Sequence, residues 1–231
     1  MPENRFYTDS LFQENHSVNI SGEELHHLRV MRKKMGDPLE LVNGKNELAK
    51  GALQEIGKHS ALIHIEKVVR GPKKEKKVVL VQAFTRPSAL EYIIEKGTEL
   101  GVSEFWLFPG ARSEKKELGE GQKRRLHLLL IAAMKQCGRL DLPEIHEKTS
   151  LAKWNPLTGQ KFFGDVREKA SPLSLLSQED VFFFIGPESG FSDEEVQILE
   201  QQLQAKGVKL HENILRVDTA ALAAMALVYA R

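Results

Sequence analysis

Cysteine is almost absent from this sequence, and so are long hydrophobic runs. The single cysteine in 231 residues, Cys137, excludes internal disulfide bonds and fits a reducing cytosol. We expect Cys137 to be a small buried residue near a helix end. No apolar run reaches the ~20 residues that span a bilayer, and the first ten residues lack a signal-peptide core. These absences predict a cytoplasmic protein with no membrane partner.

A metal centre and an excess of one charge are also missing. His26 and His27 are adjacent, a poor geometry for chelating one ion, and no Cys/His grouping has the spacing of metal ligands. We therefore expect no metal. Lys and Arg number 33 against 32 Asp and Glu, so the net charge is +1. Composition alone does not indicate a nucleic-acid partner.

A short linker, residues 71–77 ("GPKKEKK"), separates two regions with different patterns. A Gly-Pro pair opens it, and a charged run follows. Before it, short alternating segments predict strands at 18–20, 38–42, 47–55 and 60–69. Ser21 and Glu24 can form a capping box that starts a short helix. We expect residues 1–70 to form a small β-rich domain.

After the linker, apolar strands alternate with helical patterns. The expected buried strands are "VVLVQAF", "VSEFWLF", "KFFGDV" and "VFFFI". A helix is expected after the first of them, started by a capping box of Ser88 and Glu91, and a longer helix spans 121–137. Two-sided apolar strands joined by helices predict a mostly parallel α/β sheet for residues 78–231. The Ala-rich "TAALAAMALVYAR" predicts a last helix that packs closely on another helix or on a second chain.

The segment "IGPESGFSDEEV" joins a buried strand to a helix, whose start is marked by a capping box of Ser192 and Glu195. Gly186 and Gly190 let the backbone come close to a bound molecule, and open α/β sheets bind ligands at such strand ends. An ordinary tight connection explains the two glycines equally well.

Two further segments favour a binding site. "ILRVDT" places Arg216 and Asp218 at the entrance of a strongly apolar helix, although Asp218 capping that helix would also explain the pattern. "FWLFPGARS" ends another strand and is followed by Arg112. In the first region, "HHLRVMRKK" can place Arg29, Arg32 and Lys33 on one helix face that contacts phosphates. A solvated basic face is the commoner explanation.

Five motifs occur in order along the chain: "HHLRVMRKKMGD", "EKGTELGV", "AAMKQCGR", "IGPESGFSDEEV" and "ILRVDTAALAAMAL". With them the whole chain resembles the ribosomal RNA small subunit methyltransferase E (RsmE) family of the SPOUT superfamily. The resemblance implies a PUA-like β-barrel that holds RNA, followed by a SPOUT domain with a C-terminal trefoil knot. It also implies a homodimer that methylates a uridine of small-subunit (16S) rRNA at N3, with S-adenosyl-L-methionine as methyl donor.

By resemblance, the cofactor lies among the loops of the knot. The residues expected to bind it are Phe163, Gly164, Ile185, Gly186, Pro187, Glu188, Gly190, Ile214, Leu215, Arg216, Val217, Thr219 and Ala220. Three positions depart from the family pattern: Ser189 stands where a second glycine is usual, Asp218 where a glutamate is usual, and Ala111 where an acid usually precedes the Arg112-Ser113 pair. None of these changes removes a group that the chemistry needs.

Methylation at uracil N3 requires loss of the N3 proton and stabilisation of the charge left on the flanking oxygens. Arg216 and Arg112 are expected to stabilise that charge, because arginine stays protonated and offers forked donors. Glu188 or Asp218 is expected to help remove the proton. The residues expected to contact free rRNA or the assembled small subunit are His26, His27, Arg29, Arg32 and Lys33.

Three other functions stay open. A nucleotide-dependent oxidoreductase would share the sheet and the glycine turn, but no G-x-G-x-x-G follows "VVLVQAFTRPS". A SPOUT methyltransferase for another base or for a ribose hydroxyl would keep the same fold and cofactor. A non-catalytic ribosome-assembly factor would bind RNA without the methyl donor.

Overall fold

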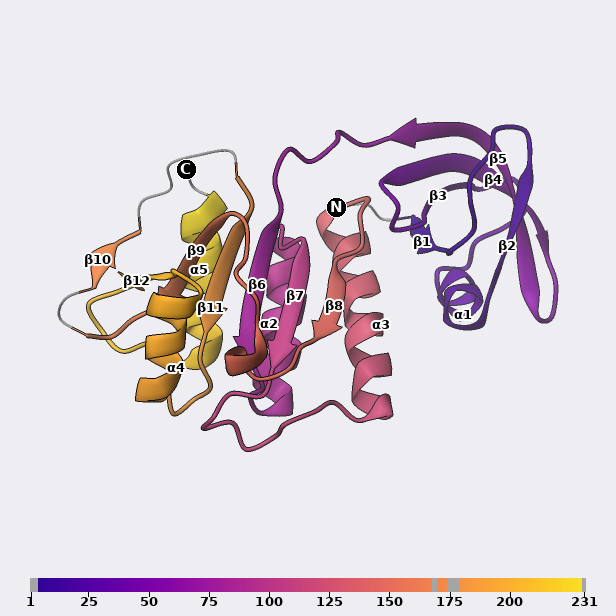
Figure 1. The fold of residues 1–231 in the computed structure, drawn as a ribbon. Coiled ribbons are helices and arrows are strands. Elements are labelled where there is room, and N and C mark those ends of the chain that lie inside the picture. The colour runs from indigo at the N-terminus through magenta and orange to yellow at the C-terminus, as the bar shows by residue number, and fades with distance from the viewer. Residues whose placement is uncertain (1–3, 168–169, 174–178, 230–231) are drawn as a thin grey trace. The chain divides into compact units, whose positions relative to one another are not determined.

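The computed structural model describes residues 4–167, 170–173 and 179–229 (Figure 1). The chain divides into two compact units, Met1–Lys73 with Ile131–Leu142, and Lys74–Leu130 with Pro143–Arg231. The long helix α3 (Glu120–Cys137) therefore contributes its last turns to the first unit. Cys137 ends this helix and is exposed, so the expectation that it would be buried is wrong.

The first unit is built on a five-stranded sheet of order β1-β3-β4-β5-β2. Its strands are β1 (Arg5–Tyr7), β2 (Ser17–Ser21), β3 (Pro38–Val42), β4 (Glu47–Ile56) and β5 (Ser60–Arg70). β1 runs parallel to β3, and the other neighbours are antiparallel. The four strands predicted from alternation are confirmed, because one face of each packs on a shared core.

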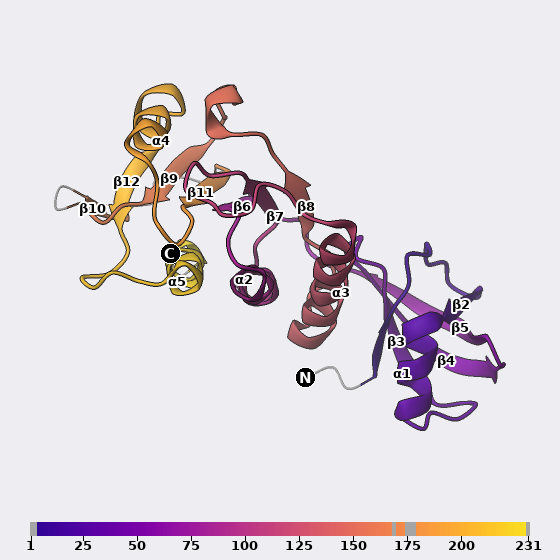
Figure 2. The ribbon, with the colours of Figure 1, turned by 90° about the horizontal axis from the view of Figure 1, so that it is seen from below.

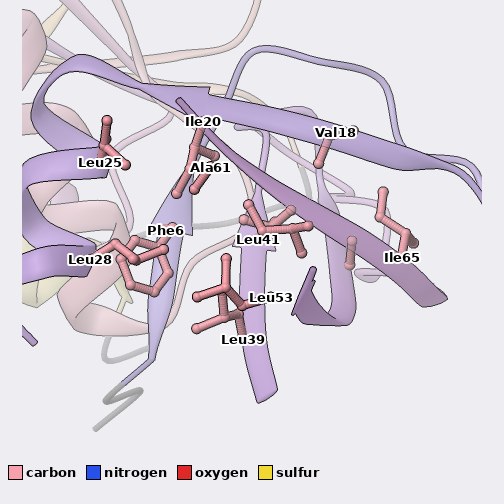
Figure 3. Close-up of a cluster of buried hydrophobic side chains, with 12 residues drawn as sticks. Phe6, Val18, Ile20, Leu25, Leu28, Leu39, Leu41, Leu53, Ala61 and Ile65 are labelled. Carbon is pink, nitrogen blue, oxygen red and sulfur yellow. The ribbon is translucent and has the colours of Figure 1, made fainter. Parts of the chain in front are cut away.

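That core lies between the sheet and helix α1 (Gly22–Val30), which contributes Leu25 and Leu28 (Figure 3). Ser21 precedes α1 as predicted, but its side chain makes no capping hydrogen bond. The Glu24 carboxylate instead accepts from the amide of Tyr7 over 3.1 Å and from Lys135. The predicted capping box is therefore wrong, because partners distant in sequence engage the glutamate.

The second unit contains a seven-stranded sheet of order β10-β12-β9-β11-β6-β7-β8. All its neighbouring strands are parallel, which confirms the predicted sheet type. The strands are β6 (Val78–Ala83), β7 (Glu104–Phe108), β8 (Glu144–Glu147), β9 (Gln160–Gly164), β10 (Ser171–Pro172), β11 (Val181–Ile185) and β12 (Lys206–Lys209). Every residue of the central strands β6 and β11 is buried, since helices cover both faces.

Helices α2 (Pro87–Glu99) and α5 (Val217–Tyr229) lie on one face of this sheet and pack on each other (Figure 2). The opposite face carries α4 (Asp193–Gln197), the π-helical turn η2 (Ile198–Gln202) and the 3-10 turn η1 (Leu151–Lys153). α2 begins after Arg86, with Pro87 in its first turn and without the predicted Ser88 cap. Glu91 pairs with Arg125 instead, so this second capping box is also wrong.

The chain order at the end of the sheet positions the site. From β12, near one edge, the chain returns through residues 210–216 to α5, which contacts the central strands β11 and β6. The returning loop thereby comes beside the carboxyl ends of β9 and β11. The trefoil knot itself stays a prediction. No helix in the described part of the chain is long and apolar enough to cross a membrane.

Candidate functional site

A cavity of about 540 Å³ lies in the second unit, within the size range of small-molecule sites. Three segments form most of its lining: 163–167 at the end of β9, 185–191 at the end of β11, and 209–215 from the end of β12. Helices α4 and α5 add Asp193, Val196, Val217 and Ala220. Arg112, from the loop after β7, reaches the same space. The walls are thus the carboxyl ends of parallel strands, where open α/β sheets bind their ligands.

The structure brings nearly all residues of the predicted cofactor pocket around this cavity. Only Arg216 and Thr219, of that predicted set, do not line it. The cavity also takes in residues that sequence reasoning missed, among them Asp165, Arg167 and the loop 209–213. These residues directly follow β9 and β12, so the strand-end rule that selected Gly186 could have found them.

The turn after β11 favours glycine at two positions. A Cβ at Gly186 would lie 3.1 Å from the amide nitrogen of Phe191, a tight contact with backbone. Gly190 has φ +72, and its amide donates to the carbonyl of Pro187 over 2.9 Å. Ser189, the departure from the family's glycine pattern, is not among the positive-φ residues. Its side chain therefore adds no backbone strain.

Glu188 lies at the centre of this turn and is held from the end of β6. Its Oε1 accepts from the Thr85 hydroxyl, from the Arg86 amide over 3.0 Å and from Arg86 Nε over 3.2 Å. Partial burial raises the pKa of Glu188, but these hydrogen bonds outweigh it and hold the pKa below its ordinary value. Glu188 is a carboxylate at neutral pH. Its fixed partners, Thr85 and Arg86, were not predicted.

Gln82 fixes the start of the same turn from the centre of the sheet. This fully buried residue of β6 donates from Nε2 to the carbonyls of Ala83 and Gly186, over 3.0 and 3.3 Å. Its Oε1 has no partner among the described residues. Both partners are carbonyl oxygens, which only accept, so the NH2 group of the Gln82 side chain must face them.

An ion pair, Asp165 with Arg167, forms part of the cavity lining. The Asp165 side chain is only 7% exposed, and its carboxylate accepts from Arg167 Nε and Nη2. Arg167 also pairs with Glu200. Burial raises the pKa of Asp165, but the bonds from Arg167 outweigh it, so the pKa lies below the usual range. The apolar side chain of Ile214, also part of the cavity lining, is 85% exposed.

The two predicted arginines differ in their placement. Arg112 lines the cavity, and its Nη1 donates to the Ser189 carbonyl over 3.0 Å. Arg216 is exposed and lies outside the lining, although its neighbour Leu215 belongs to it. Asp218 also lies outside the lining, and its Oδ1 accepts from the amide of Thr219 over 2.7 Å. The structure therefore gathers Arg112 and Glu188 at the cavity, but not Arg216 and Asp218.

The basic cluster of the first unit does not form the predicted helix face. α1 ends at Val30, and Arg32 has a left-handed backbone with φ +54. The Arg32 amide donates to the Arg29 carbonyl over 2.9 Å, and the Lys33 amide donates to the Leu28 carbonyl over 3.3 Å. This is a Schellman motif, which stops the helix. The prediction of one shared helical face is therefore wrong.

Two members of the cluster make contacts inside the unit. Arg29 donates from Nη2 to the carbonyls of Gly57 and Lys58, both over 2.9 Å, and so holds the β4–β5 turn. The His27 ring packs on Phe6, with 5.1 Å between centroids. His26, Arg29 and Arg32 are exposed, and His27 and Lys33 are partly buried. Within the described ranges, no group of His, Cys, Asp and Glu side chains could hold a metal ion.

Comparison with known proteins agrees with this architecture. The family described as RNA methyltransferase domain matches residues 72–229, and the one described as RNA methyltransferase PUA domain matches residues 20–66. The chain is 26% identical to the ribosomal RNA small subunit methyltransferase E of Rickettsia conorii, over 99% of this chain and 96% of that protein. It is 29% identical to the Bacillus subtilis protein of the same name, over 96% and 93%.

Solved structures share the fold along the whole chain. A Legionella pneumophila methyltransferase, determined with bound cofactor SAM, is 25% identical, with a TM-score of 0.88 over 98% of this chain and 96% of that one. The ribosomal RNA small subunit methyltransferase E of Neisseria gonorrhoeae, bound to S-adenosyl methionine, is 24% identical with a TM-score of 0.86 over 98% and 97%. With a family match over most of its length and a PUA-like sheet before an all-parallel α/β sheet, the chain belongs to the RsmE family of SPOUT RNA methyltransferases.

Proposed function

We propose that this protein transfers a methyl group from S-adenosyl-L-methionine to N3 of a uridine in 16S rRNA. The observation that carries the proposal is the cavity at the ends of β9 and β11, in a chain whose relatives carry the name of this rRNA methyltransferase. An rRNA substrate places the reaction in the cytoplasm. A homodimer is proposed from the family resemblance.

The residues around the cavity suit the methyl donor. The cavity volume of about 540 Å³ can hold a nucleoside with an amino-acid tail. The crowding at Gly186 and the left-handed Gly190 bring backbone polar groups to the wall, while Ile185, Ile214 and Leu215 offer apolar surface for a base. The segments that would hold the donor are 163–167, 185–190 and 210–215. When bound, the donor supplies a methyl group already activated by a sulfonium charge.

Arg112 is the first candidate to stabilise the negative charge that develops on uracil. It is a cavity residue, and the Ser189 carbonyl engages one of its five N–H donors. The other donors would face the uracil oxygens next to N3, and the planar fork of the guanidinium suits two neighbouring acceptors. Arg216 is the second candidate, because it follows the lining residue Leu215 and is exposed to an arriving RNA.

The N3 proton must leave before or during methyl transfer, and Glu188 is the better placed of the two proposed acceptors. It lines the cavity, and its lowered pKa keeps it ionised at neutral pH, so it can accept a proton as a weak base. Asp218 lies outside the lining and accepts from Thr219.

His26, Arg32 and Lys33 would contact RNA phosphates from the first unit, with Arg29 and His27 shaping that surface.

Mapping of rRNA modifications tests the proposal. We expect one uridine of the small-subunit rRNA to carry an N3 methyl group in cells with the protein and to lack it in a deletion strain. Purified protein with methyl-labelled S-adenosyl-L-methionine should restore the mark on either naked 16S rRNA or isolated small subunits, which identifies the substrate. A mark on another base or on a ribose would replace the proposed target, and RNA binding without methyl transfer would replace the enzyme by an assembly factor.

A further inference from the structure

Glu195 makes a contact that its role as a helix cap does not require. In the capping box of α4, its Oε2 accepts from the Ser192 amide over 2.9 Å, and its own amide donates to Ser192 Oγ over 3.2 Å. One carboxylate oxygen is enough for this motif. Yet Glu195 is only 6% exposed, and a buried carboxylate is costly unless its remaining lone pairs are also satisfied.

The second oxygen reaches a loop 84 residues earlier in the chain. Glu195 Oε1 accepts from the amide of Ala111 over 2.8 Å. Ala111 immediately precedes Arg112 in the loop that follows β7. A single carboxylate therefore joins the start of α4, which ends the cofactor turn, to the backbone that carries the proposed catalytic arginine. Hydrogen bonds from amides to a carboxylate are shorter and stronger than neutral ones.

The rest of the loop is fixed against the same elements. Ser113 is buried, and its Oγ donates to the Phe84 carbonyl over 2.7 Å. A Cβ at Gly110 would lie 3.4 Å from Pro187 Cδ, so the loop backbone packs against the cofactor turn. Arg112 itself donates to the Ser189 carbonyl. With Ala111, these contacts leave the arginine backbone little freedom relative to the turn.

We propose that Glu195 is a positioning residue, which sets the place of Arg112 over the cavity by holding the Ala111 amide. The proposal rests on the proposed function, because Arg112 acts on the substrate only in that reaction. A displacement of a catalytic group by about 1 Å can lower a rate by about 100-fold. Loss of the Glu195 contact is therefore expected to reduce turnover more than loss of the cap alone.

Ser192 provides a matched control. Ser192→Ala removes the hydroxyl that accepts from the Glu195 amide, but it leaves both carboxylate contacts in place. Glu195→Ala removes the carboxylate contacts to the Ser192 and Ala111 amides but keeps the bond from its own amide to Ser192 Oγ. Glu195→Gln keeps the size of the side chain with one acceptor oxygen. We expect Ser192→Ala to keep kcat within about 2-fold of wild type, while Glu195→Gln lowers it about 10-fold and Glu195→Ala about 100-fold.

Amide hydrogen exchange supplies a readout that does not depend on activity. In the full-length protein, exchange at Ala111 should become about 10-fold faster in Glu195→Ala and stay unchanged in Ser192→Ala. The proposal is wrong if the two alanine variants lose kcat equally, or if Ala111 exchanges at the wild-type rate in Glu195→Ala. If wild-type protein transfers no methyl group, the proposed function fails, and the exchange rates alone decide whether Glu195 holds the loop.

Discussion

The hydroxyl of Thr85 donates to Oε1 of Glu188, and this bond ties the end of β6 to the centre of the turn after β11. The two residues lie 103 positions apart in the chain, and each follows the carboxyl end of one of two neighbouring parallel strands. The Arg86 amide donates to the same oxygen over 3.0 Å. The turn after β11 is thus shaped by a neighbouring strand end as well as by its own glycines.

Replacing Thr85 by valine is expected to raise the pKa of Glu188 toward its ordinary value, because the carboxylate loses a donor while its burial remains. The loosened turn should weaken S-adenosyl-L-methionine binding by about 3- to 10-fold, the equivalent of one hydrogen bond. A carboxyl titration by NMR and calorimetry with the donor measure the two effects. Thr85→Ser, which keeps the hydroxyl, should match wild type in both. Equal affinities in the valine and serine variants would refute this role.

A single-turnover methylation assay can separate the contributions of the two arginines proposed for catalysis. Arg112→Ala is expected to lower kcat about 100- to 1,000-fold, the effect of removing one donor to a developing oxyanion. Arg112→Lys should recover little of this, since an ammonium lacks the planar fork. Arg216 lies outside the cavity lining, so Arg216→Ala should cost less than Arg112→Ala. The reverse order, measured by single-turnover methylation, would transfer the main role to Arg216.

Local sequence patterns predicted the elements well, because buried strands and amphipathic helices follow from hydrophobic periodicity alone. They failed where a side chain had a distant partner. The sequence predicts three capping boxes, yet only Ser192 and Glu195 form one. Glu24 is taken by Tyr7 and Lys135, and Glu91 by Arg125. A local motif indicates which hydrogen bonds a glutamate can make, but the tertiary structure determines which partner it contacts.

The candidate site shows the same division. The glycines and strand ends of the site can be recognised from the sequence, because a turn that approaches a ligand needs small residues. The partners of Glu188 and Glu195 could not be predicted. Thr85, Arg86 and Ala111 contact these carboxylates only because the strand order β11-β6-β7 places the loops after β6 and β7 near the turn after β11. The exposure of Arg216 was equally hidden, because a sequence shows the position of a residue and not its direction.

Arg32 allows RNA binding to be tested apart from stability. It occupies the left-handed position of a helix end, φ +54, where glycine is free of strain. Arg32→Gly should therefore leave the first unit as stable as wild type or stabilise it by up to about 1 kcal/mol. If Arg32 contacts a phosphate, the same change should weaken RNA binding and lower its salt dependence by about one counterion. Thermal melts and filter binding at several salt concentrations measure both.

Charge reversal at the same site tests the alternative that these basic residues are merely solvated. Arg32→Glu keeps the strained backbone and should weaken RNA binding further than Arg32→Gly at low salt. Arg29→Ala serves as the comparison, because Arg29 holds the β4–β5 turn and should mainly lower stability. Unchanged affinity in Arg32→Glu at low salt would show that this surface does not meet RNA.

Asp165 makes the stability of the second unit depend on pH. Its pKa is lowered in the folded protein, so the pair with Arg167 stabilises the fold above the unfolded pKa of about 3.9 and stops doing so as the pH falls through the lower folded value. Asp165→Asn should therefore be less stable than wild type by about 1–3 kcal/mol at pH 6. The difference in unfolding free energy should shrink steadily below about pH 4.

Denaturant unfolding of both proteins between pH 3 and pH 7 measures this difference. Glu200→Gln is the control, because Glu200 meets the same arginine at an exposed position, and such pairs contribute at most about 1 kcal/mol. A gap between wild type and Asp165→Asn that stays constant down to pH 3 would mean that the Asp165 charge does not stabilise the cavity wall.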